Sequence, residues 1–137
     1  MKKIILLLLL KSFPVILIHS SPLDEFLWKN RIVVTFSPSK NNTERSYFLN
    51  SINNNICEFN SRNIIHIDLI FNEKNHEIEK FESFFENLSL SASEFRLILI
   101  GKDGELKLNS RKASLDKIFT LIDKMPMRKE EIINDKC

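Results

Sequence analysis

Both glycines of this 137-residue chain, Gly101 and Gly104, lie in one short stretch between two apolar runs. The runs are residues 96–100 and 105–108, and the four residues that join them read Gly-Lys-Asp-Gly. An Asp-Gly pair between apolar runs is a strong signal for a β-hairpin, because glycine readily adopts the positive φ of tight turns. The stretch therefore predicts two adjacent antiparallel strands. It also leaves no glycine for a phosphate-binding or dinucleotide-binding loop.

The chain before the hairpin alternates between two kinds of apolar pattern. Residues 31–36 and 64–71 are short runs rich in β-branched residues, which predict buried strands. Between them, residues 42–60 place apolar side chains at helical spacing, and residues 73–88 do the same after the second strand. After the hairpin, Ser114 can cap a last helix, which Pro126 ends.

The predicted order of elements is βαβαββα in one domain of residues 21–137. Two strands joined through a helix lie parallel with a right-handed crossover, and the hairpin adds two antiparallel strands. The result is an α/β fold, a mixed four-stranded sheet with helices on both faces, which is the thioredoxin-like arrangement. A ferredoxin-like α+β sandwich is the alternative. We expect a short flexible C-terminal tail from about residue 129.

The N-terminus has the pattern of a secretory signal peptide. Met1-Lys2-Lys3 precedes an apolar run that extends to Ile18, and cleavage after Ser20 leaves a small residue at the last position of the peptide. Lys11 and Pro14 interrupt the run, which is shorter than the roughly 20 apolar residues of a membrane span. We expect a periplasmic or secreted protein without a membrane span after cleavage. The alternative is an uncleaved anchor.

The charge balance argues against nucleic acid as a partner. The chain has 20 Lys and Arg against 18 Asp and Glu, a net charge of +2. Removal of residues 1–20 takes away three lysines and leaves a net charge of −1. A nearly neutral domain lacks the basic surface that binds phosphate backbones.

Three stretches resemble a known family. They are residues 28–39, residues 99–108 and residues 119–128, and the most specific part is Met-Pro-Met-Arg at 125–128. Together, over residues 24–132, they are similar to a domain of unknown function in exported bacterial proteins, which also occurs as a peroxiredoxin-like module in animal sushi-repeat matrix proteins. The resemblance implies a thioredoxin-like fold and brings no established activity.

The positions at which this fold carries out thiol chemistry contain no cysteine. The turn after the first strand, residues 37–42, reads Ser-Pro-Ser-Lys-Asn-Asn in place of a Cys-x-x-Cys motif. The peroxiredoxin pattern Pro-x-x-x-Thr-x-x-Cys, counted from Pro38, places Asn42 at the threonine and Arg45 at the cysteine. Residues 92–95 lack the proline that thioredoxins hold in cis. These replacements favour a non-catalytic domain.

The two cysteines leave several interpretations open. Cys57 lies about 130° around its helix from the apolar stripe, so we expect it near solvent, and Cys137 is the last residue. Outside the cytoplasm the two thiols can form a Cys57–Cys137 disulfide, form intermolecular bonds, or remain free. A thiol-dependent oxidoreductase or peroxidase that acts through Cys57 is the alternative to a non-catalytic domain.

Other polar residues give weaker signals. His66 and Asp68 lie two apart on one face of a strand, without the further ligands that a metal site needs. The glutamates of residues 73–88 follow a helical period opposite the apolar stripe, which is typical of a solvated face. There is no Gly-x-Ser-x-Gly motif. We interpret Trp28 as a core residue that covers the sheet edge.

Four polar residues within the resembling stretches are the candidate binding residues: Arg31, Lys102, Asp103 and Arg128. A structural role is the competing interpretation, because Asp103 suits the turn and Arg128 can pair with Glu131 or Asp123. The leading hypothesis is a non-catalytic, exported module that binds another exported protein or an envelope component and needs no cofactor or metal. A purely structural envelope protein is a further alternative.

Overall fold

A mixed four-stranded sheet forms the centre of the computed structural model, which describes residues 21–73, 78–81, 86–135 and 137. The strands are listed here in chain order: β1 (Arg31–Ser37), β2 (Ile64–Ile70), β3 (Arg96–Ile100) and β4 (Leu106–Ser110). Their spatial order is β2-β1-β3-β4, with β2 parallel to β1 and the other pairs antiparallel. The predicted sheet is therefore confirmed.

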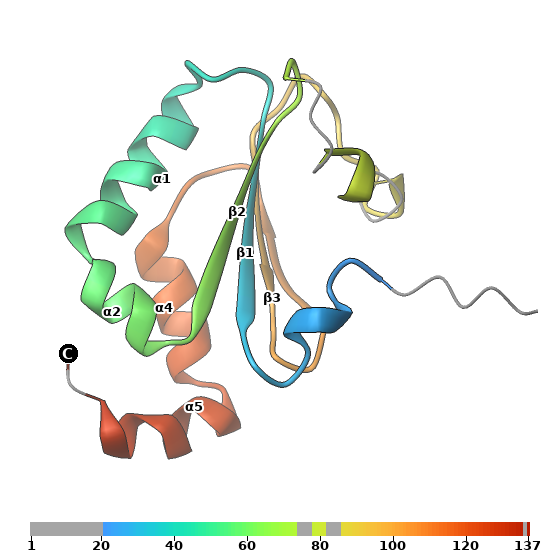
Figure 1. The fold of residues 1–137 in the computed structure, drawn as a ribbon. Coiled ribbons are helices and arrows are strands. Elements are labelled where there is room, and N and C mark those ends of the chain that lie inside the picture. The colour runs from blue at the N-terminus through green and yellow to red at the C-terminus, as the bar shows by residue number, and fades with distance from the viewer. Residues whose placement is uncertain (1–20, 74–77, 82–85, 136) are drawn as a thin grey trace, which may run out of the picture.

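Helices cover one face of this sheet (Figure 1). They are α1 (Thr43–Asn54), α2 (Ile56–Ser61) and α4 (Leu115–Asp123). Their buried residues, such as Phe48 and Ile118, pack against Val33 and Leu99 of the strands. The short η1 turn (Asp24–Phe26) and the segment around Phe81 lie on the other face, where a second apolar cluster forms. Two covered faces explain why β1 is buried along its whole length.

The hairpin between β3 and β4 forms as the glycine spacing predicts. The Gly104 N–H donates to the Gly101 carbonyl at 3.0 Å, and the Gly101 N–H donates to the Glu105 carbonyl at 2.9 Å. Gly104 has a φ of 79°, which a residue with a side chain rarely adopts. A Cβ at this position would lie 2.8 Å from Leu27, so the turn requires glycine in two ways.

The predicted helix over 42–60 is divided into two helices at Asn55. The Asn55 side chain donates to the Ser51 carbonyl at 2.8 Å, and Asn55 has a φ of −129°, outside the helical range. Asparagine side chains compete with the backbone for such hydrogen bonds and favour helix ends. The predicted helix over 73–88 falls partly outside the described residues, and its described residues 78–81 are helical.

The C-terminal segment differs from the expected flexible tail. Pro126 ends α4 but also begins α5 (Pro126–Glu131), and the η2 turn (Ile132–Asn134) follows directly. Proline suits the first turn of a helix, where its missing N–H has no partner to lose. Side-chain contacts of Glu131 and Asp135 and the bond at Cys137 hold this segment against the domain.

Trp28 is also a correction, because its side chain is 66% exposed and is not part of the core. Its φ is 62°, and its backbone N–H donates to the Lys102 carbonyl at 2.7 Å. The backbone of this residue, and not the indole ring, therefore joins the N-terminal segment to the hairpin. Among the described residues, no helix has the length and apolarity that crossing a membrane requires.

Candidate functional site

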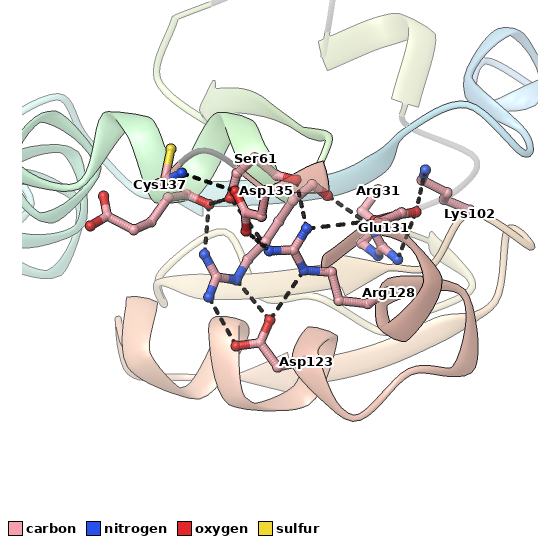
Figure 2. Close-up of polar contacts among 10 residues, drawn as sticks. Arg31, Ser61, Lys102, Asp123, Arg128, Glu131, Asp135 and Cys137 are labelled. Atoms are coloured by element: carbon pink, nitrogen blue, oxygen red, sulfur yellow. Dashed lines mark hydrogen bonds and ion pairs between the residues drawn. The ribbon is translucent and has the colours of Figure 1, made fainter. Parts of the chain in front are cut away.

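Three of the four predicted binding residues meet at one end of the sheet, around the carboxylate of Glu131 (Figure 2). Arg31 begins β1 and donates to Glu131 at 2.9 Å, while Lys102, just after β3, donates to it at 2.7 Å. Arg128 lies one helical turn before Glu131 on α5, and its closest nitrogen is 3.9 Å from that carboxylate. The fold thus gathers residues from the first strand, the hairpin and the last helix.

These cations stabilise the ionised form of Glu131. Partial burial acts to raise the pKa of its carboxyl group, but the hydrogen bonds from Arg31 and Lys102 outweigh burial and leave the pKa below its ordinary value. Arg31 is only 1% exposed and Lys102 only 9% exposed. Two nearly buried cations therefore share one carboxylate.

Arg128 ties the end of the chain to α2 and α4. Its side chain is buried, and its guanidinium donates to the Ser61 carbonyl at 2.8 Å and to Asp123 at 3.4 Å. It also donates to the carboxylate of Asp135. Figure 2 shows these contacts converging on Arg128. Because a buried guanidinium needs partners for its donors, this side chain specifies where residues 123–135 pack.

Arg62, which follows α2, completes the network. It donates two hydrogen bonds of 2.9 Å to Asp123, and its guanidinium carbon lies 4.1 Å from the centre of the Phe119 ring. Burial acts to raise the pKa of Asp123, but hydrogen bonds from Arg62 and then Arg128 lower it below the ordinary value. Arg128 thus lies within ion-pair distance of both carboxylates that the sequence suggested, Asp123 at 3.4 Å and Glu131 at 3.9 Å.

Cys57 and Cys137 form a disulfide beside this network, with their Cα atoms 5.9 Å apart. Cys57 lies on α2 and is exposed, as its helical position predicts. The Cys137 N–H donates to Asp135 at 3.2 Å, and this bond, together with Arg128, lowers the pKa of the Asp135 carboxyl group. A surface groove of about 530 Å³ runs along the disulfide. Of the three interpretations of the cysteines, the structure contains the intramolecular bridge.

Asp103, the fourth predicted binding residue, lies outside the network. It accepts from the Glu105 N–H at 3.0 Å and pairs with Lys107 at 2.8 Å, as a turn residue does. Burial acts to raise the pKa of Asp103, and the bonds from Lys107 and the Glu105 backbone lower it below the ordinary value. The structural interpretation from its sequence position accounts for these contacts.

A cavity of about 240 Å³ opens next to Lys102. Arg31 and Lys102 border it with their nearly buried side chains, and the exposed Trp28 stands at its edge. Pro126 and Met127 supply further apolar surface from the start of α5. The cavity thus combines apolar walls with two buried cations, the features by which small binding pockets fix the orientation of a ligand.

The turn at which thioredoxin-like proteins carry their thiol lies at the opposite end of β1. Arg45 stands at the position of the peroxidatic cysteine in the sequence pattern, and it binds Asp68 at 2.5 Å and the Lys40 carbonyl at 2.9 Å. Thr35 contacts His66 at 2.7 Å and Asp68 at 2.9 Å. An ion pair and a hydrogen-bonded cluster therefore occupy this region.

His66 and Asp68 share one face of β2, as their spacing predicts. Burial lowers the pKa of His66, which favours the neutral ring that packs against Phe48 at a centroid distance of 5.6 Å. Both side chains contact Thr35, and Asp68 also accepts hydrogen bonds from Arg45. These contacts are those of a structural pair.

Sequence reasoning did not single out Arg62, Asp135 or Thr35. Arg62 and its partner Asp123 lie 61 positions apart, and Thr35 and His66 lie 31 positions apart. Only Asp135 and its partner Arg128 are close along the chain, at 7 positions. Even that spacing exceeds the three or four positions at which helical side chains meet, so no local pattern could have identified it.

Comparison with known proteins gives a family and a fold. Residues 22–131 match the family model described as Domain of unknown function (DUF4174). No curated protein matches the chain. Among solved structures, reduced 2-Cys peroxiredoxin of Plasmodium vivax is similar, with a TM-score of 0.56 and 15% identity over 77% of this chain and 70% of that one.

Two proteins of Plasmodium yoelii are similar to the same degree. Thioredoxin peroxidase I has a TM-score of 0.55 and 17% identity, over 84% of this chain and 82% of the other. Prx1a modified at its N-terminus has a TM-score of 0.54 and 17% identity, over 82% of each chain. At this identity the likeness establishes the thioredoxin-like fold alone.

Proposed function

We propose that this chain, which belongs to the family described as Domain of unknown function (DUF4174), is an exported and non-catalytic thioredoxin-like module that binds another protein or an envelope component. The export part of the proposal rests on the signal-peptide pattern of residues 1–20, which lie outside the described residues. The two other parts, binding and the lack of catalysis, rest on separate observations.

The observation that carries the binding role is the exposed Trp28 beside the cavity. A large aromatic ring that is 66% exposed costs solvation energy in the free protein and contributes strongly when a partner covers it. Met127, at 38% exposure, extends the same apolar surface on the other wall of the cavity. An aromatic residue at the rim of a preformed pocket is typical of a recognition site.

The non-catalytic role is supported by the contacts of Arg45. A thiol oxidoreductase of this fold needs a nucleophilic cysteine at the start of α1, where helix N–H groups stabilise a thiolate. Here the Arg45 guanidinium pairs with Asp68, and the Arg45 N–H donates to the Asn42 side chain that caps α1. In this region, structural contacts of Arg45 stand where a catalytic cysteine would be needed.

Site-specific photo-crosslinking tests the binding role. We expect a benzophenone amino acid at Met127 to yield one discrete crosslinked product with the exported protein fraction. The same group at Tyr47, a more accessible position at 60% exposure on α1, is the control and should yield none. Trp28→Ala should reduce the Met127 product at least tenfold, because hot-spot aromatic side chains contribute about 2 kcal/mol or more. Absence of a product, or equal products at both positions, would contradict the proposal.

A thiol oxidoreductase or peroxidase acting through Cys57 is the second candidate, which the exposed Cys57–Cys137 disulfide favours. A partner dithiol would attack this disulfide, become oxidised to a disulfide itself, and leave Cys57 and Cys137 as two thiols. The Cys57 thiolate would then attack a peroxide, releasing an alcohol or water and becoming a sulfenic acid, and the Cys137 thiol would condense with this sulfenic acid to restore the disulfide and release water.

Insulin reduction and peroxide consumption separate the two candidates. Both rates should be the same in the wild type and in Cys57→Ser, at the level of an unrelated protein, if the domain is non-catalytic. A rate well above that background that disappears in Cys57→Ser would establish the second candidate.

A further inference from the structure

The cavity beside Trp28 has the size of an anchor site for one side chain. Its volume of about 240 Å³ is below the usual range of about 300–1,000 Å³ for pockets that enclose a whole small molecule. Its walls are formed by Trp28, Met125, Pro126 and Met127, which present mostly apolar surface. A cavity of this kind suits a leucine- or phenylalanine-sized group that projects from a larger partner.

The base of the cavity has hydrogen-bond donors to spare. The Lys102 ammonium carries three protons, and among the described residues its one acceptor is Glu131, at 2.7 Å. The buried Arg31 Nε has no acceptor in the described part of the chain, although both terminal nitrogens of Arg31 bind Glu131. Unsatisfied donors of nearly buried cations are costly, so an additional acceptor at this point would be stabilising.

The local charge favours an anion as that acceptor. Arg31 and Lys102 carry two positive charges against the single negative charge of Glu131. Lys107, the remaining cation at the cavity, forms ion pairs of 2.8 Å with both Asp103 and Glu105, so that group carries one net negative charge. The positive excess is therefore confined to the side of the cavity at Arg31 and Lys102, while the hairpin side, which Asp103 lines, is acidic.

We propose that the cavity binds a segment of a partner protein in which an apolar side chain stands next to an aspartate or glutamate. The apolar group enters between Trp28 and Met127, and the carboxylate accepts a hydrogen bond from Lys102. This inference rests on the proposed binding function and specifies its partner. A positive excess confined to Arg31 and Lys102, in an apolar cavity with an acidic hairpin side, fits this pair of groups better than it fits a polyanion.

The single tryptophan of the chain gives a direct assay, because Trp28 lies at the cavity. Two probe peptides, acetyl-Gly-Leu-Asp-Gly-amide and acetyl-Gly-Leu-Asn-Gly-amide, differ only in the carboxylate. We expect saturable quenching or enhancement of Trp28 fluorescence with the Asp peptide and about tenfold weaker binding of the Asn peptide, as for the loss of a charged hydrogen bond. This comparison uses the wild-type protein and does not depend on a variant that folds.

Two variants complete the test. In the Lys102→Met variant, the Asp and Asn peptides should bind with equal affinity. The control is Lys112→Met, because Lys112 is an exposed lysine beyond β4. This variant should keep the tenfold preference for the Asp peptide. Equal binding of both peptides to the wild type, or no binding of either, would overturn the assignment of the partner. If crosslinking at Met127 still yields a specific product, the binding function itself survives that outcome.

Discussion

Arg128→Met lowers the free energy of unfolding by about 3 kcal/mol, the low end of the cost of breaking a buried ion pair. Arg128 is 1% exposed and donates to Asp123, Asp135 and the Ser61 carbonyl. Methionine fills much of the same volume but donates no hydrogen bond, so Asp123, Asp135 and the Ser61 carbonyl each lose the partner that joins them to the buried position of Arg128. Asp123 keeps Arg62, which is why we expect the low end.

Urea unfolding monitored by circular dichroism measures this loss as a lower midpoint at an unchanged slope. Lys129→Met is the matched control, because Lys129 is the exposed neighbour of Arg128 on α5. Its variant should unfold within about 0.5 kcal/mol of the wild type. A loss below about 1 kcal/mol in Arg128→Met would show that the network contributes little to folding.

Removing the disulfide has an effect of similar or larger size. The Cys57–Cys137 bond closes a loop between residues 80 positions apart. Cross-linking a loop of this length restricts the unfolded chain and stabilises the fold by about 4 kcal/mol, with measured values of about 2–5 kcal/mol. We therefore expect the double variant Cys57→Ser/Cys137→Ser to unfold at a clearly lower urea concentration than the wild type.

Reduction of the wild type gives an independent measure of the same bond. Reduced and alkylated protein should lose as much stability as the double serine variant, and intact mass before and after reduction reports the bond directly. On protein isolated from outside the cytoplasm, the same mass also shows whether the chain begins after Ser20. A reduced protein as stable as the oxidised one would contradict the prediction.

The two losses should not add. Arg128 binds Asp135, two positions before Cys137, so the ion pair and the disulfide hold the same C-terminal segment. Once the disulfide is absent and that segment detaches, Arg128 has fewer partners left to lose. Combining Arg128→Met with the two serine substitutions should cost measurably less than the sum, as for other coupled neighbours.

The fold was predictable because its signals are local. β-Branched runs mark β1 and β2, the Asp103-Gly104 turn marks the hairpin, and the Ser114 cap marks the start of α4, where Ser114 accepts from the Lys117 N–H at 3.2 Å. Each of these features acts within a few residues, so the sequence shows it directly. Their order then leaves few sheet topologies, of which the mixed sheet is one.

The errors arose where a local pattern had a second solution. The apolar spacing on either side of the asparagines at 53–55 fits one continuous helix. Asn55 nevertheless ends α1, where its side chain donates a hydrogen bond to the Ser51 carbonyl. Pro126 ends one helix and begins another, which its fixed φ allows equally well. Trp28 was assigned to the core from its hydrophobicity, but its positive φ belongs to a turn in which the ring stays exposed.

Residue types and spacing along the chain were enough to predict the strands and the hairpin, because turn chemistry and side-chain periodicity act over short distances. They were also enough to show that no cysteine stands at the positions where this fold carries out thiol chemistry. The family resemblance singled out Asp103 and three cations, Arg31, Lys102 and Arg128, as candidate binding residues. That these cations gather around Glu131 emerged from the folded chain, since Arg31 and Glu131 lie 100 positions apart. Such a contact depends on how the start of β1, the hairpin and α5 pack together, and so does the cavity that they border with Trp28.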